Sequence, residues 1–315
     1  MIALLVRRTL VGLLTLWAAS VLVFAGTEVL PGDVVSAVLG QSRTPESVAA
    51  IRELLQLDRP APERYFEWLL GLFQGDLGRS LISGRLVTEV IQGWLWNTLI
   101  LAGVTALLVV PISFGLGLVS AAYPNSFLDR AISISTLMVV SVPEFLTASV
   151  LVLWFAVNLN LLPATSNVSA SATTAELLRA LALPVATLTI ASLAHMTRMT
   201  RAAILDVIRS PYVEMAVLKG VPKWRILIRH ALPNAIGPII NVIALVLGYL
   251  VSGVVIVEAV FSYPGLGRLI LDSVGFRDLP MVQALAMIFC AFYIGVNLLA
   301  DIVVLVTNPR LHDSR

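Results

Sequence analysis

Residues 210–233 read SPYVEMAVLKGVPKWRILIRHALP, a polar and basic stretch between two long apolar runs; we call it the island. Ser210 is a residue type that caps helices, and Pro211 suits the first helical position. Gly220 fits the position just after a helix end, and Pro222 lies beyond it. The island therefore predicts two short helices with a break between them, rather than an irregular loop.

A helix from Pro211 to Lys219 is too short to be stable alone in water, so it needs something to pack against. A short apolar helix face is typical of an element that sits in a groove of another protein. We therefore interpret the island as a docking element; the alternative is that its basic residues only contact anionic lipid. The candidate docking residues are Glu214, Met215, Ala216, Leu218, Gly220 and Val221.

The composition is that of a polytopic membrane protein. The chain has 315 residues, of which 58% are hydrophobic and 13% charged, with a mean hydropathy of +0.92. A soluble protein of this length could not bury so much apolar surface. Cys290 is the only cysteine, which excludes an internal disulfide and a cysteine metal cluster, and we interpret it as a packed hydrophobe. The net charge of +2 does not indicate an acidic partner, and we expect no nucleic-acid ligand.

Six apolar stretches are candidates to cross the membrane, which takes about 20 residues per helix. The third contains Glu144, the fourth is the shortest, and the first is longer than the core of a cleaved signal peptide, so we expect a retained anchor. The sequence thus predicts an all-α polytopic membrane protein with six transmembrane helices. The stretches are residues 9–30, 97–122, 131–158, 180–197, 234–258 and 281–306.

Basic residues in short loops set the orientation of a membrane protein. If six helices span, most of these residues fall on one side, namely Arg7, Arg8, Arg130, the seven of residues 198–229, Arg310 and Arg315. We expect both termini and the island in the cytoplasm and residues 31–96 outside, since so long a loop crosses regardless of its charge. The predicted parts are the tail and first span (1–30), the extracytoplasmic segment (31–96), a five-helix core with the cytoplasmic loop 198–233 (97–309) and a cytoplasmic tail (310–315).

The extracytoplasmic segment is predicted to be partly helical. Apolar residues recur with helical spacing in residues 46–57 and 62–74. Trp94 and Trp96 stand just before the second span, where interfacial aromatic residues are expected. Two interpretations stay open: a lid that shields the helix ends, or a surface that contacts a receptor protein.

The sequence holds no visible catalytic constellation. His195, His230 and His312 are isolated, no nucleotide-binding lysine loop is present, and the Gly-x-Gly pairs at 114–118 and 264–269 do not follow strands. We therefore expect a protein that is not an enzyme and that binds no cofactor or metal itself.

Polar residues within the apolar stretches are candidates for a transport path, because such groups are costly in lipid. Glu144 is placed deepest and follows Pro143, which is expected to kink its helix; Glu28, Glu258 and Asp301 lie near span ends. The alternative for each is a structural hydrogen bond between helices. The candidate pathway residues are Asn97, Glu144, Asn241, Ser252 and Asn297.

The island resembles the cytoplasmic signature of binding-protein-dependent ABC importer permeases, which reads Glu-Ala-Ala, three residues, Gly, nine residues, Ile-x-Leu-Pro. Met215 and His230 depart from that pattern. The positions that match at the right spacing are Glu214, Ala216, Gly220, Leu232 and Pro233.

Further segments are similar to the dipeptide and oligopeptide group of these permeases. Those after the fifth span include Phe261, Pro264, Gly265 and Gly267. So many motifs in order indicate the first of two permease subunits. The segments are LPGD (30–33), LDRPAPERY (57–65), GDLGRS (75–80), NTLILA (97–102), VSVPEF (140–145), VIVEAVFSYPGLGRLILDS (255–273) and DIVVLVTNPRL (301–311).

The resemblance implies a set of partners in a bacterial or archaeal cytoplasmic membrane. They are a homologous second permease subunit, two cytoplasmic ATPase subunits that carry ATP and Mg, an extracytoplasmic substrate-binding protein, and membrane lipid. It also implies that the island sits in a cleft of one ATPase and that the cargo is a peptide or a related solute such as a nickel complex, glutathione or a sugar.

Two other function classes stay open. One is a secondary carrier or channel that works without ATP, which would be expected to show inverted repeats with broken helices at the membrane midplane. No such symmetry is visible in the sequence. The other is a membrane scaffold that recruits a cytoplasmic partner without transporting anything.

Overall fold

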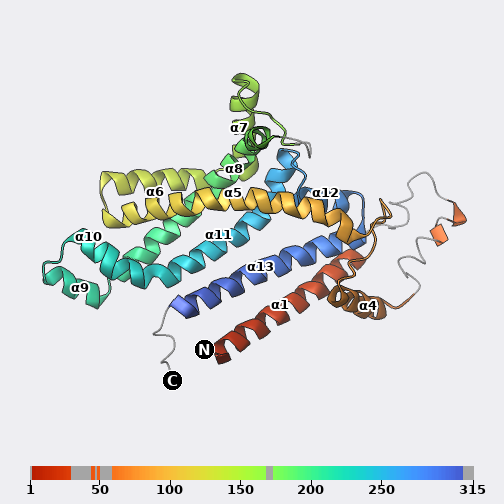
Figure 1. Ribbon diagram of the computed structural model, residues 1–315, viewed down its shortest axis with the longest axis horizontal. Helices are drawn as coiled ribbons and strands as arrows, with labels where there is room; N and C mark the ends of the chain where they lie inside the picture. Colours follow the sequence, from red (N-terminus) through yellow and green to blue (C-terminus); the bar gives the residue numbers. More distant parts are fainter. Residues whose placement is uncertain (1, 30–43, 47, 50–58, 168–172, 308–315) are drawn as a thin grey trace. The chain divides into compact units, whose positions relative to one another are not determined.

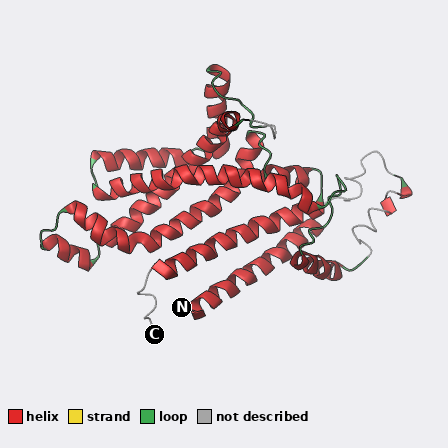
Figure 2. Ribbon diagram, in the orientation of Figure 1, coloured by secondary structure: helices red, strands yellow, loops and turns green. Residues whose placement is uncertain are grey.

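The structure is a computed structural model that describes residues 2–29, 44–46, 48–49, 59–167 and 173–307. Figure 2 shows helices joined by loops, and no strand is drawn among the described residues. Within these residues, five helices are long and apolar enough to cross a membrane, and a bent pair makes a sixth span if it is counted as one. The predicted all-α polytopic membrane fold is therefore confirmed.

The apolar stretches predicted as spans lie within helices that extend beyond them or within the bent pair. Shorter helices occupy the connections (Figure 1). In chain order they are α1 (Ile2–Val29), α4 (Ala61–Gln74), α5 (Val87–Ala122), α6 (Phe127–Val140), α7 (Glu144–Leu151), the π-helical η1 (Val152–Asn158), α8 (Thr174–Ile208), α9 (Pro211–Leu218), α10 (Lys223–Arg225), the π-helical η2 (Ile226–Ala231), α11 (Leu232–Val260), α12 (Leu266–Gly275) and α13 (Leu279–Thr307).

The chain forms two compact units, which are described separately here. The first comprises residues 1–8, 99–263 and 295–315, and the second comprises residues 9–98 and 264–294. Helices α1, α5 and α13 contribute residues to both. The four parts predicted from the sequence are divided by the side of the membrane on which each is expected, whereas the two units are divided by packing. The predicted parts therefore stay a prediction.

The core of the first unit is built from α5, α8 and α11. Leu101, Leu188, Met196 and Leu250 are fully buried there, and they come from helices far apart in the sequence. Removing apolar side chains from their surroundings contributes roughly 25 cal/mol per Å², and close packing adds dispersion contacts. This core supports the helix ends to which the island is attached.

The third predicted span is broken rather than kinked. α6 ends at Val140, α7 starts at Glu144, and the two helices are bent by 97°. Pro143 has an extended backbone (φ −59°, ψ 143°). Proline offers no N–H and disfavours helical geometry at the residue before it, so the helix ends there. The expected kink in one helix of residues 131–158 is therefore corrected to two helices that meet at a sharp bend.

The second unit contains the helix predicted from residues 62–74. It is α4, which ends at Gly75 in the left-handed conformation (φ 80°). Its Tyr65 hydroxyl shares a hydrogen bond of 2.9 Å with Ser20 of α1, and the Tyr65 and Phe24 rings lie 5.5 Å apart. The helical prediction is confirmed for this segment, whereas most of residues 46–57 lies outside the described residues.

Candidate functional site

The first helix of the island forms where the sequence predicted it. α9 starts at Pro211, and the preceding Ser210 has the extended backbone of a capping residue (φ −71°, ψ 145°). The Ser210 hydroxyl does not accept a hydrogen bond from α9, however, but donates one to the Val207 carbonyl at the end of α8 (2.6 Å). The expected side-chain cap is thus corrected, and Ser210 joins α8 to α9 instead.

Gly220 ends α9 as predicted. Its φ is +73°, and its N–H donates to the Val217 carbonyl (2.9 Å). The next N–H, of Val221, donates to the Ala216 carbonyl (3.1 Å). This pair of bonds is a Schellman motif, which satisfies carbonyls at the helix end. A Cβ added at Gly220 would meet nothing within 4 Å, so the position needs glycine for its backbone conformation and not for space.

The second helix of the island is not a separate short helix. α10 continues as the π-helical η2, and η2 leads directly into α11. Pro233 lies where the π-helical turn of η2 passes into α11. The predicted helical pair of residues 211–231 is therefore corrected to one short helix, α9, packed beside the first turns of a long helix.

The side chains of α9 divide into an inner and an outer face. Val213 and Ala216 are buried against Ile226, with Val221 beside them. Ala216 and Val221 therefore hold the island together rather than pointing away from it. Of the candidate docking residues, Glu214 is exposed, and Met215 and Leu218 are 54% and 76% exposed. These three side chains form what we call the outer face of α9.

A hydrogen-bonded group that the sequence analysis missed ties α9 to the start of α11. The Tyr212 hydroxyl donates to the His230 carbonyl. The side-chain amide of Asn234 donates to the Tyr212 hydroxyl (2.7 Å) and to the same carbonyl (2.8 Å). No local pattern predicts these bonds, because the partners are brought together only by the reversal of the chain at Gly220.

An apolar pocket of about 300 Å³ lies between the island and the C-terminal ends of α5 and α8. It shows that the island packs over helix ends of the first unit instead of extending freely from them. The lining residues are Ala121, Ala122, Tyr123, Pro124, Ile208, Val217, Val221, Lys223, Trp224, Ile226 and Leu227.

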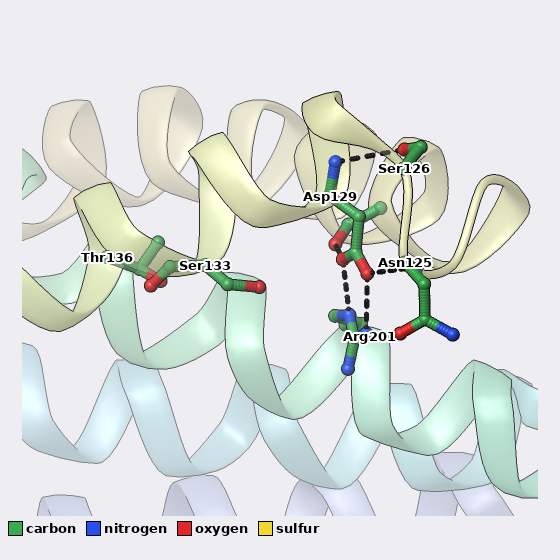
Figure 3. A network of polar contacts seen from close by, with 7 residues as sticks. Asn125, Ser126, Asp129, Ser133, Thr136 and Arg201 are labelled. Carbon is green, nitrogen blue, oxygen red and sulfur yellow. Dashed lines mark hydrogen bonds and ion pairs between the residues drawn. The ribbon is translucent and has the colours of Figure 1, made fainter.

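An ion pair between a buried carboxylate and a partly exposed guanidinium lies at the same end of the first unit and was also missed (Figure 3). Asp129, in the first turn of α6, is 3% exposed. Arg201 of α8 donates to both of its carboxylate oxygens, from Nε to Oδ1 (2.7 Å) and from Nη2 to Oδ2 (2.8 Å). Ser120 donates to Oδ1, and the Asn125 N–H donates to Oδ2 (2.8 Å). The pair joins residues 72 positions apart, so no short motif announces it.

The signature residues after the fifth span build a turn. Phe261 is fully buried in the first unit, where burial raises the pKa of the nearby Tyr263 phenol and the Glu258 charge adds to the rise. In the second unit Gly265 precedes α12, and Gly267 is buried within it. These positions thus have structural roles.

Asn97 of α5 is hydrogen-bonded to that turn. Its side-chain amide donates to the Pro264 carbonyl (2.8 Å), and the neighbouring Thr98 hydroxyl accepts from the Leu266 N–H (2.8 Å). This geometry favours the structural alternative for Asn97 over a pathway role. Asn241 is exposed on α11 and Asn297 is half-buried on α13.

The remaining polar residues of the spans are Ser252 and the acids near the span ends. The side chain of Ser252 lies outside the described part of the chain. Two of the acids near span ends are paired, Glu28 with Arg64 and Asp301 with Arg8. Their charges therefore have structural partners.

Glu144 lies at the bend between α6 and α7 and contacts α11. Its carboxylate accepts a hydrogen bond from the Tyr249 hydroxyl (2.5 Å). A Cβ at Gly253, one turn further along α11, would lie 3.3 Å from Glu144 Oε1. The glycine thus lets the carboxylate pack directly on the helix, and the contact holds the broken span against α11.

We expect Glu144→Gln to keep transport within about threefold of wild type, because an amide oxygen can still accept from Tyr249. Glu144→Ala should lower the free energy of unfolding by about 1–3 kcal/mol, since it removes the hydrogen bond that joins Glu144 to Tyr249. Uptake into vesicles and thermal unfolding measure the two effects, with Tyr249→Phe as the matched variant. A tenfold loss of uptake in Glu144→Gln would instead assign the charge to the transport path.

Comparison with known proteins gives a family match over most of the chain. The family described as binding-protein-dependent transport system inner membrane component matches residues 113–313, and the model of its N-terminal part matches residues 1–88. The chain is 32% identical to a probable peptide ABC transporter permease protein of Sinorhizobium fredii, over 97% of this chain and 98% of the relative.

Two further relatives carry a different cargo in their names. A glutathione transport system permease protein of Pectobacterium atrosepticum is 34% identical, over 96% of this chain and 97% of the relative. One from Escherichia coli is 33% identical, over 97% and 98% respectively. The similarity thus extends over nearly the whole length of each protein.

Proposed function

Because this chain belongs to the family of binding-protein-dependent transport system inner membrane components and is an ABC permease, we propose that it is the first permease subunit of an ATP-driven importer. It would pair with a homologous second permease, bind two cytoplasmic ATPase subunits, and receive its cargo from an extracytoplasmic binding protein. ATP and Mg would be bound by the ATPases and not by this chain.

The observation that carries the proposal is the geometry of α9. It is an eight-residue helix with a glycine-dependent end, and Met215 and Leu218 are exposed on its outer face. So short a helix gains little stability of its own, and exposed apolar side chains favour burial against a partner. Seating α9 in an ATPase groove would bury these side chains and attach the motor to α8 and α11.

The proposed cargo is a peptide or a related small solute. The names of the relatives support this class, since one refers to peptides and two to glutathione, itself a small peptide. The proposed orientation places both termini and the island in the cytoplasm, and the positive-inside distribution of arginine and lysine supports it.

The docking proposal predicts a cross-link from Leu218. In a Cys290→Ser background, Leu218→Cys should be captured by an ATPase subunit in the assembled complex when a short thiol-to-amine cross-linker is added. Leu178→Cys is the matched control, because Leu178 is also exposed (59%) but lies in the first turns of α8, far along that helix from the island. Mass spectrometry of the cross-linked products reports the result.

Capture of the ATPase from Leu218 and not from Leu178 would support the proposal. Capture from neither position, or modification of Leu218→Cys by a reagent confined to the outside, would contradict it. Uptake that continues with ATP depleted and a proton gradient intact would favour the ion-driven carrier instead.

A further inference from the structure

We propose that the Asp129–Arg201 ion pair is a positioning element that makes the α5–α6 hairpin and α8 move as one body during transport. The inference rests on the proposed docking of α9. Only Arg209 and Ser210 separate the end of α8 from the start of α9, so a displacement of α9 is transmitted directly to α8, as it is to α11 through the Tyr212 hydrogen bonds. The ion pair between α8 and α6 would then transmit the movement of α8 to α6.

The geometry of the pair resists both separation and rotation. Arg201 makes two parallel hydrogen bonds to the two carboxylate oxygens of Asp129. A two-bond fork of this kind fixes the relative orientation of its partners as well as their distance. Because Asp129 is buried, water cannot easily replace either bond. α6 therefore cannot turn against α8 without breaking both hydrogen bonds of this pair.

The same carboxylate also shapes the turn between α5 and α6. Asn125 has a left-handed backbone (φ 63°), and its N–H donates a hydrogen bond to Asp129 Oδ2 (2.8 Å). Ser120, near the end of α5, donates to Asp129, and Ser126 caps α6 by accepting from the Asp129 N–H (3.2 Å). One side chain thus links α5, the turn and α6 to α8 (Figure 3).

A role in stability alone does not account for this arrangement. Replacing an ion pair of this kind by apolar side chains of similar volume is often neutral or stabilising, and the best-attested use of such a pair is to specify one register. The variant Asp129→Leu with Arg201→Met therefore removes both charges and leaves neither charge unpaired, while the Ser120 hydroxyl and the Asn125 N–H lose their acceptor. This double variant shows whether losing the fixed register of α6 on α8 impairs transport while the protein stays folded.

The test compares this double variant with the wild type in the complete importer in lipid nanodiscs, with dipeptides and glutathione as cargo. The readouts are thermal unfolding, ATP hydrolysis with and without cargo-loaded binding protein, and cargo transported per ATP. A second readout is the distance between spin labels at Phe127→Cys on α6 and Leu178→Cys on α8, with and without ATP. Both positions are exposed.

We expect the double variant to assemble and hydrolyse ATP at the basal rate, while cargo transported per ATP falls at least tenfold. The label distance should stay constant on ATP binding in the wild type and change or broaden in the variant. Arg201→Lys keeps the charge but loses the fork, so its coupling should be intermediate. Removing the exposed pair of Arg85 and Glu89 by glutamine substitutions is the control and should leave coupling unchanged.

Coupling and label distances like those of the wild type in the double variant would overturn the inference. So would loss of assembly in that variant, which would make the pair a stability element, or an ATP-dependent label distance in the wild type. Failure of the underlying function has a different signature, because the wild-type complex itself would then show no cargo-stimulated hydrolysis.

Discussion

Gly220→Val should abolish cargo-stimulated ATP hydrolysis in the reconstituted importer, with a loss of at least tenfold, while the chain still inserts and assembles. Gly220 has φ +73°, a conformation that costs an L-residue about 1–2 kcal/mol and is a clear outlier for a β-branched one. The eight residues of α9 have little stability to offset that cost. We expect the helix end to unwind and the outer face to lose its orientation toward the ATPase.

The matched control is Gly220→Asn, because asparagine tolerates the left-handed region and is found at this helix position. It should retain most of the stimulation. A steric explanation would predict that both variants fail, but a Cβ at this position has no atom within 4 Å. Normal stimulation in Gly220→Val would contradict the docking role of α9.

Gly117→Val should prevent the first unit from packing and lower the free energy of unfolding by about 3 kcal/mol or more. A Cβ at Gly117 of α5 would lie 2.8 Å from the Thr200 Cβ and 3.1 Å from the Thr197 carbonyl oxygen, both on α8. The backbone oxygen cannot rotate away as a flexible side chain would, so the two helices would have to separate. Thermal unfolding of the purified full chain in detergent measures the effect.

Gly115→Val, two residues earlier on α5, is the control for that change. A Cβ there would meet nothing within 4 Å, so the substitution should shift the free energy of unfolding by less than about 1 kcal/mol. If both variants unfold at the wild-type temperature, the close approach of α5 and α8 is not needed for the fold. If both are equally destabilised, the effect belongs to helix propensity and not to packing.

Local patterns in the sequence were enough to predict the long apolar helices of this protein, together with α4 and α9. Apolar runs marked the membrane-crossing segments, Pro143 marked an irregularity in the third of them, and Pro211 and Gly220 marked the ends of α9. These signals depend on neighbours within one or two helical turns, and such neighbours are visible in a linear chain. The family signature is also a short motif, so it is visible in the sequence, and the resemblance that it carries implied the partner proteins.

The same local signals failed where packing between helices determines a bend angle, the continuity of a helix or the direction of a side chain. Proline predicts that a helix stops but not the angle that follows, and the 97° bend at Pro143 depends on contacts such as that of Glu144 with α11. The second island helix was predicted to be separate, yet it continues through a π-helical turn into α11. Ala216 was predicted to face a partner, but its burial against Ile226 directs it inward.

The sequence by itself thus determined that this is an all-α membrane protein with a short helix ended by Gly220, because hydrophobic periodicity and backbone preferences are properties of short segments. Only the tertiary structure decided which groups restrain one another, as Arg201 restrains Asp129 and Thr200 limits Gly117. These contacts join residues more than 70 positions apart, and they exist only after the helices have packed. Hydrogen bonds and close contacts depend on distances of a few ångströms in space, which separation along the chain does not specify.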